Sequence, residues 1–157
     1  MKVSTLRALS PVDGRYAGKV DALRDVFSEY ALIRFRVLVE VRWLQCLTDE
    51  PGVTNLAPLS NVMKDVLNHI TDDFSIEHAE RIKAIEATTN HDVKAVEYFI
   101  REQIGDGPET DTLKDFLHFG CTSEDINNLA YALMLRSACR DVVMPRMREL
   151  RNRLRNL

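Results

Sequence analysis

Residues 122–157 read TSEDINNLAYALMLRSACRDVVMPRMRELRNRLRNL, and this stretch decides the fold class. Its apolar residues step by threes and fours along most of its length, as in the seam of a helix bundle or coiled coil: Ile126, Leu129, Leu133, Val143, Met147, Leu150, Leu154 and Leu157. We predict one long helix here, with Pro145 as the candidate position of a kink. An apolar seam of this length needs partner helices, so we expect either oligomerisation or truncation.

The rest of the chain also has a helical period, and no stretch alternates as a strand would. We predict an irregular segment followed by a series of helices, over about 19–47, 59–71, 75–87 and from near residue 90, with a loop over 49–58. Gly105-Asp106-Gly107-Pro108 is the best linker. The sequence therefore predicts an all-α protein with an N-terminal helical domain over 1–111 and the start of a helix-bundle domain over 112–157.

The composition excludes several classes of protein. With 157 residues, 45% hydrophobic and 29% charged, the chain has a globular composition and no apolar run that approaches a membrane span. Its first residues contain neither a signal core nor a transit peptide, which favours a cytoplasmic protein. Cys46, Cys121 and Cys139 lack metal-type spacing and indicate free thiols in a reducing compartment. The four histidines are scattered, so we expect no metal site.

The basic charge of the chain is concentrated at its C-terminal end. Residues 146–157 hold five arginines and one glutamate in a chain of net charge -3. A short basic tract can bind nucleic acid, but these arginines fall within a regular apolar series and have no aromatic residues between them to stack on bases. We therefore predict a solvated helix flank and no nucleic-acid partner.

The first polar cluster is TTNHDVKAVEY, residues 88–98. Thr89 or Asn90 is expected to cap a helix, and Asp92 in the first turn favours the positive end of the helix dipole. These capping and charge effects explain Thr89, Asn90 and Asp92 without any role in binding or catalysis. His91 gains nothing obvious as a cap, and a histidine can transfer a proton or switch its hydrogen bonds near neutral pH. His91 is therefore a candidate functional residue, with the helix start favouring its neutral form.

A second cluster is LHFGCTSEDINN, residues 117–128. Thr122 and Asp125 have capping-box spacing, which many helices share. Alternatively, Thr122, Ser123 and the free N–H groups of this helix start hold an anion such as a carboxylate. His118 is expected to be a core histidine without a functional role.

The third cluster is SPVDGRY, residues 10–16. A turn on Asp13-Gly14 would present Arg15 and Tyr16 with little freedom, and a guanidinium suits phosphate or carboxylate. The simpler interpretation of this dipeptide is a surface ion pair beside an aromatic plug.

Four motifs, SPVDGRY, FSEYALIRFRVLVEVRWL, TTNHDVKAVEY and HFGCTSEDINN, together resemble the bacterial-type adenylosuccinate lyase family of the fumarase and aspartase superfamily. The resemblance runs from Ser10 to the last helix. It implies a carbon–nitrogen lyase of purine biosynthesis that eliminates fumarate from adenylosuccinate, giving AMP, and from SAICAR, giving AICAR. It also implies a cytoplasmic homotetramer in which three subunits build each active site, without metal, organic cofactor, nucleic acid or membrane.

The same resemblance implies a set of substrate-binding residues: Arg15, Tyr16, Asn90, His91, Asp92, Thr122 and Ser123. The Arg-Tyr pair corresponds to the residues that bind the phosphate end of the nucleotide. The Asn-His-Asp motif binds the substrate, and its histidine either transfers a proton or orients the ligand. The Thr-Ser pair corresponds to the residues that hold the succinyl and later fumarate portion.

Family members are much longer than this chain, and their remaining part contains a second histidine as general acid and a mobile loop with a serine as base. We therefore expect the chain to be the N-terminal portion of a lyase and to be inactive alone. Two alternatives stay open. One is a relative such as argininosuccinate lyase, and the other is a non-catalytic helical assembly module.

Overall fold

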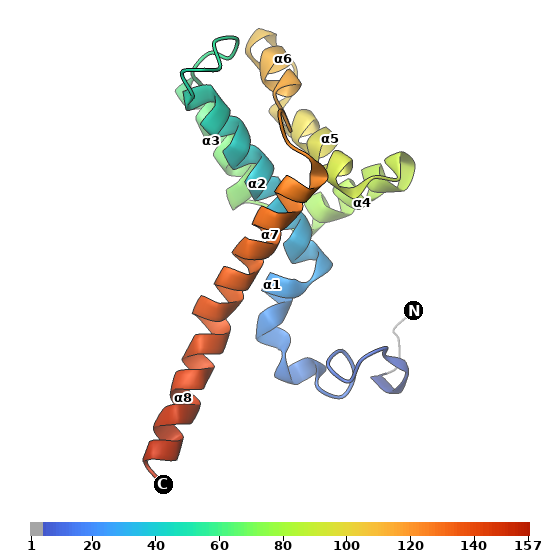
Figure 1. Ribbon diagram of the computed structural model, residues 1–157. Coiled ribbons are helices and arrows are strands. Elements are labelled where there is room, and N and C mark those ends of the chain that lie inside the picture. The colour runs from blue at the N-terminus through green and yellow to red at the C-terminus, as the bar shows by residue number, and fades with distance from the viewer. Residues whose placement is uncertain (1–4) are drawn as a thin grey trace.

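The computed structural model describes residues 5–157, and every regular element in that range is a helix (Figure 1). The predicted all-α class is confirmed. Three single 3-10 turns, η1 (Thr5–Arg7), η2 (Ala17–Lys19) and η3 (Asp21–Leu23), precede the longer helices. These are α1 (Arg24–Phe27), α2 (Glu29–Asp49), α3 (Asn61–Asp72), α4 (Ile76–Thr89), α5 (Asp92–Ile104), α6 (Pro108–Asp115), α7 (Ser123–Ser137), the π-helical η4 (Ala138–Val143) and α8 (Met144–Arg155).

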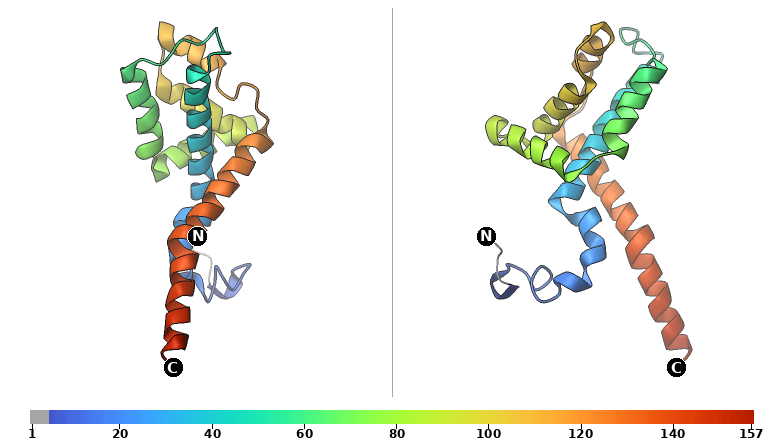
Figure 2. Two further views of the ribbon diagram at one scale, coloured as in Figure 1. Left: turned by 60° about the vertical axis from the view of Figure 1, so that its left-hand side comes forward. Right: turned by 180° about the vertical axis from the view of Figure 1, so that it is seen from behind.

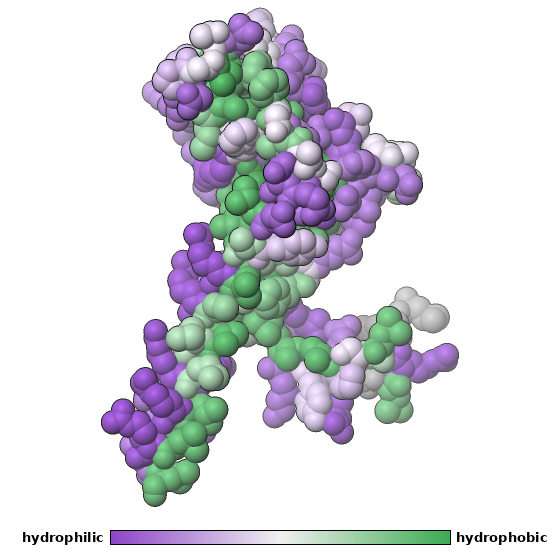
Figure 3. Space-filling view, in the orientation of Figure 1, coloured by the Kyte–Doolittle hydropathy of each residue, from purple (hydrophilic) through white to green (hydrophobic). Residues whose placement is uncertain are grey.

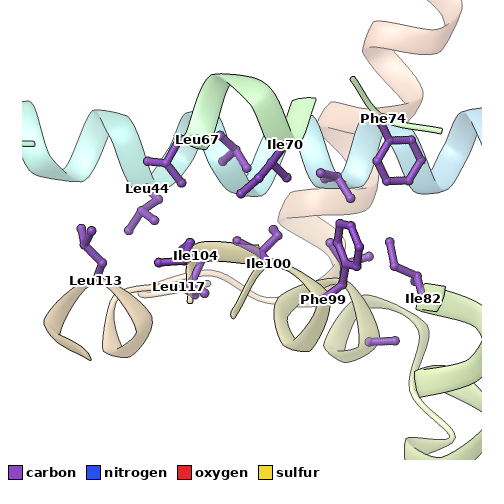
Figure 4. Packing of buried hydrophobic residues seen from close by; sticks show 14 of the residues in the cluster. Leu44, Leu67, Ile70, Phe74, Ile82, Phe99, Ile100, Ile104, Leu113 and Leu117 are labelled. Atoms are coloured by element: carbon purple, nitrogen blue, oxygen red, sulfur yellow. The ribbon is translucent and has the colours of Figure 1, made fainter. Parts of the chain in front are cut away.

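Helix α2 is the centre of the main hydrophobic core. Its buried side chains pack with those of α3, α4, α5 and α6 in one cluster that includes Val41, Leu44, Leu67, Phe99 and Ile100. In Figure 4 the residues of α3 and α2 face those of α5 and α6 across this core. Several of them are wholly removed from water, and burying each such side chain typically stabilises the fold by about 1.5–3 kcal/mol.

The helix predicted over 19–47 begins later than expected, and this prediction is wrong at its N-terminal end. Ser28 has extended backbone with ψ 166°, and its hydroxyl accepts a hydrogen bond from the N–H of Ala31 at 3.2 Å. A serine that caps in this way starts a new helix, because its own backbone leaves the helical region. The preceding residues form only short turns and α1.

The glycine-rich segment predicted as a linker starts a helix. Pro108 occupies the first turn of α6, where its missing N–H does no harm, and Gly107 stands before it with extended backbone. Leu113 in α6 and Leu117 beyond it are buried in the same core cluster as α2. The division of the chain into two domains stays a prediction.

The predicted long C-terminal helix is confirmed as one continuous rod from α7 through η4 to α8 (Figures 1 and 2). Pro145 lies in the first turn of α8, directly after the π-helical segment. A proline interrupts the α-helical hydrogen-bond ladder, and a wider turn is one way for a helix to accommodate that loss.

One side of this rod is apolar and open to solvent. Figure 3 shows apolar surface running along α8 beside a strip of polar residues. The exposed large apolar side chains of the rod include Leu135, Met147, Leu150 and Leu154. The second and third hydrophobic clusters cover the other side only near α7, where Phe35 and Val39 of α2 meet it.

Three further observations concern residues 5–157. None of their helices combines the length and the apolar character needed to cross a membrane. They contain no group of three or more histidine, cysteine or acidic residues that could hold a metal ion. Cys46, Cys121 and Cys139 are free thiols, as predicted.

Candidate functional site

The junction between α4 and α5 is a sharp turn made by two residues of the first polar cluster. Asn90 has left-handed backbone (φ 53°, ψ 33°) and closes α4 by donating its N–H to the carbonyl of Glu86 at 2.8 Å. Asparagine is one of the few residues that adopt this conformation readily. Because Asn90 ends one helix, the next residue is free to start another.

His91 is itself the N-cap of α5. Its Nδ1 accepts a hydrogen bond from the N–H of Lys94 at 3.1 Å, and its backbone is extended. The expectation that Thr89 or Asn90 would cap this helix, and that His91 would gain nothing as a cap, is therefore wrong. An imidazole nitrogen can replace the usual serine or aspartate oxygen because it also offers a lone pair to the orphan N–H groups of the first turn.

This cap determines which hydrogen bonds the His91 ring can offer to a ligand. An Nδ1 that accepts carries no hydrogen, so in the neutral ring the hydrogen resides on Nε2. The side chain of His91 is about half exposed, at 52%. The ring is thus presented at the surface as a hydrogen-bond donor through Nε2.

Asp92 is joined to α7 through a buried arginine of α2. The Arg36 guanidinium lies 2.7 Å from Asp92 Oδ2, and its Nε donates to Asn127 Oδ1 at 2.9 Å. Partial burial acts to raise the pKa of Asp92, but the charge of Arg36 and the N–H of Val93 outweigh it and hold the pKa below its usual value. Arg36 therefore clamps the start of α5 to the first turns of α7.

The start of α7 has the capping box that its sequence predicts. Asp125 Oδ2 accepts from the Thr122 N–H at 2.7 Å and from the Thr122 hydroxyl at 2.9 Å. The hydrogen bonds from Thr122, the backbone N–H first, hold the pKa of Asp125 below its usual value. Ser123 follows as the first helical residue. The Asp125 N–H donates to the Thr122 carbonyl at 3.1 Å, which leaves the N–H groups of Ser123 and Glu124 without carbonyl partners in the helix.

The two helix starts are also held together by apolar contact. Val39 of α2, Val93 of α5 and Ile126 of α7 form one buried cluster. The structure therefore brings the Asn90–Asp92 motif and the Thr122–Ser123 pair to the same region of α2. Their residues are far apart in sequence, and α2 is the element that positions both.

Arg15 and Tyr16 lie apart from the starts of α5 and α7. The expected turn is present, with Gly14 N–H donating to Ser10 O at 2.9 Å, and it leads to an arginine that stacks on its neighbour. The Arg15 guanidinium carbon is 4.6 Å from the Tyr16 ring centroid, and Arg15 donates to the Tyr16 hydroxyl at 2.6 Å. In Figures 1 and 2 this N-terminal arm projects away from the start of α5. The structure brings two of the three predicted clusters together and leaves the third apart.

A buried polar network beneath the two helix starts was not predicted. Glu40 Oε1 lies 2.6 Å from His118 Nδ1, and Glu97 lies 4.0 Å from the same nitrogen while it pairs with Lys94 at 2.7 Å. Burial raises the pKa of Glu40, although its hydrogen bond to His118 acts in the opposite direction. The signal was available in FRVLVEVRWL, residues 35–44, where Arg36 and Glu40 interrupt an apolar run at a helical spacing.

Comparison with known proteins places the chain in a class. Residues 14–157 match the model of a family described as lyase, and the chain belongs to this family.

Comparison with individual proteins of known name shows which lyases the chain resembles. The chain is 51% identical to adenylosuccinate lyase of Escherichia coli K12 over 157 residues, which is 100% of the chain and 34% of that protein. It is 52% identical to adenylosuccinate lyase of Haemophilus influenzae over 150 residues, 96% of the chain and 33% of that protein. Adenylosuccinate lyase of Vibrio cholerae is 46% identical over 157 residues, again 100% of the chain and 34% of the relative. The chain thus spans about a third of the length of these curated relatives.

Proposed function

We propose that this chain supplies part of the active site of an adenylosuccinate lyase, which eliminates fumarate from adenylosuccinate to give AMP and from SAICAR to give AICAR. The observation that carries the proposal is the 51% identity with the Escherichia coli enzyme along the whole chain. The placement of two polar motifs at neighbouring helix starts supports it, because helix starts favour anions and these substrates carry carboxylates and a phosphate.

In this β-elimination a base removes a proton from the carbon beside a carboxylate, and negative charge spreads into that carboxylate. An acid then protonates the departing nitrogen. The Ser123 hydroxyl and the N–H groups of Ser123 and Glu124 suit the carboxylate, since preorganised donors aimed at developing charge supply a large share of the rate. The Thr122 hydroxyl donates to Asp125. We therefore assign Ser123 the direct contact and Thr122 chiefly the capping of the helix.

For His91 we favour the orienting role over proton abstraction. With Nδ1 engaged by Lys94, the neutral ring presents a donor and no acceptor to the ligand. It can donate to a substrate oxygen or nitrogen but cannot take a proton without losing its cap. Asp92, fixed by Arg36, and Asn90, at the turn, complete this binding motif.

Arg15 and Tyr16 are proposed to bind the phosphate end of the nucleotide. Because they lie apart from the other two motifs in one chain, we propose that they join a site through assembly, in a homotetramer whose active sites each draw on three subunits. The open apolar side of α7 and α8 supports assembly of this kind. We further propose that the enzyme is cytoplasmic and needs neither metal nor organic cofactor.

The test is an assay of the complete gene product with three compounds, adenylosuccinate, SAICAR and argininosuccinate. We expect release of fumarate from the first two and none from the third, measured by chromatography of the products. Turnover of argininosuccinate alone would favour the argininosuccinate lyase alternative. Absence of turnover with a folded, assembled protein would favour the assembly module.

A further inference from the structure

The loop that leads into α7, residues 116–122, is fastened to α2 at two points. Glu40 Oε1 lies 2.6 Å from the ring nitrogen Nδ1 of His118. Trp43 donates its indole N–H to the carbonyl of Phe119 at 2.9 Å. Residues three apart on a helix lie on the same face, so one face of α2 holds both anchors. The position of this loop is therefore set by α2.

The backbone of this loop is unusual at His118. Its φ of 61° is left-handed, a conformation that residues with a side chain rarely adopt, and Gly120 repeats it with φ 71°. A hydrogen bond of 3.1 Å from the Cys121 N–H to the His118 carbonyl closes the turn. Such a conformation is unfavourable for most residues other than glycine and asparagine, and it persists at His118 because the surroundings hold it there.

The His118 ring is surrounded by charged groups that fix its position. Glu40 is fully buried, and its second oxygen, Oε2, has no hydrogen-bond partner among residues 5–157. The His118 contact is thus the hydrogen bond that satisfies this carboxyl group. From α5, Glu97 lies 4.0 Å from the same nitrogen, with Lys94 beyond it. Losing the ring nitrogen would leave a buried carboxyl without a partner, which strongly disfavours other loop positions.

We propose that His118 and Glu40 are positioning residues for the substrate site. The pair holds the left-handed turn at His118, and this turn sets where α7 begins and where Ser123 meets the substrate carboxylate. The inference rests on the proposed lyase function, since it assigns the two residues to that site. His118 acts through the backbone of its loop and needs no contact with the substrate.

The test compares His118→Asn with His118→Ala in the complete gene product. The amide nitrogen of asparagine occupies nearly the place of Nδ1, and asparagine tolerates left-handed backbone, whereas alanine offers neither property. A small displacement of a positioning group can lower a rate by about 10²-fold, and we expect that loss in kcat for His118→Ala, with a much smaller change in KM. We expect His118→Asn to keep most of the wild-type kcat with an unchanged pH profile. We expect the same of Glu40→Gln, because glutamine retains an acceptor oxygen.

Two results would overturn the proposal. If His118→Asn is as impaired as His118→Ala and the pH profile changes, the ring takes part in the chemistry directly. If His118→Ala is as active as the wild type, the pair has no role in the site. Should the alanine variant fail to fold by circular dichroism, His118→Gln replaces it, because its amide nitrogen lies one atom too far out. A wild type inactive on adenylosuccinate and SAICAR would refute the proposed function itself.

Discussion

The helical body formed by α2 to α6 and the rod formed by α7, η4 and α8 both carry apolar stripes, but only the body covers its own. Around α2, residues such as Leu44, Leu67 and Phe99 are at most 1% exposed. On the rod, Leu150 and Leu154 are 53% and 62% exposed. A helical apolar period therefore shows that a face will be buried, but it does not show whether the same chain buries it.

The largest expected effect concerns activity, because the rod begins at Ser123, a proposed substrate contact, and leaves one apolar side exposed in this chain. We predict that the purified 157-residue chain releases no measurable fumarate from adenylosuccinate under conditions in which the complete gene product does. The measurement is fumarate formation followed by chromatography at equal protein concentration. Fumarate release by the purified chain at a rate near that of the complete product would contradict the prediction.

A second prediction compares a body residue with a rod residue. Phe99→Ala removes a side chain that is 1% exposed and should lower the free energy of unfolding by about 3–5 kcal/mol. Leu154→Ala, at an exposed position, should change it by no more than about 0.5 kcal/mol in dilute solution.

Urea unfolding followed by circular dichroism measures both variants. Equal losses of stability would show that the rod is already packed within the single chain.

A third prediction tests what covers the rod. We expect the chain to self-associate, and the double change Leu150→Glu and Leu154→Glu to weaken association. Each buried leucine contributes about 1.5–3 kcal/mol, so the dissociation constant should rise by at least about 10²-fold.

Sedimentation velocity measures this shift. The matched control is Asn152→Glu on the polar side of α8, which adds a negative charge without touching the seam. A monomeric wild type at every concentration, or equal effects of the control and the double change, would refute the idea.

The smallest expected effect concerns the loss of stability in acid, for which we compare Asp92 at the clamped start of α5 with a carboxylate on the surface. The pKa of Asp92 is lower in the folded chain than in the unfolded chain, so its ion pair with Arg36 stabilises the fold above the unfolded value and fades as the pH falls through the folded value. Because Asp92 is half exposed, we expect this contribution to be below about 1 kcal/mol.

The measurement is urea stability between pH 7 and pH 3. Asp92→Asn should flatten the loss of stability in acid, whereas Asp65→Asn, at an exposed carboxylate, should not. Identical acid profiles for Asp92→Asn and the wild type would count against the clamp.

The sequence predicts most of the helices because they depend on local period, and it predicts the Thr122–Asp125 box because those residues are three apart. It does not predict the break at Ser28 or the start of α6 at Pro108. It fails where a side chain acts in an unusual local role or at long range. His91 caps a helix with a ring nitrogen, which the usual list of capping residues omits. Glu40 and His118 are 78 residues apart, and no local pattern joins them. Arg36 and Glu40 interrupt an apolar stretch of α2, which indicates that each needs a polar partner, but the sequence does not indicate which residue that partner is.

The π-helical segment η4 changes the direction, about the axis of the rod, in which the side chains after it point. A π-helical turn takes in one residue more than an α-helical turn, and one residue corresponds to about 100° of rotation in an α-helix. The apolar residues beyond Val143 are therefore turned about the axis relative to those on α7, although the rod runs on without a break. Deleting one residue from η4 would leave the composition of the seam almost unchanged and aim its far half in a different direction.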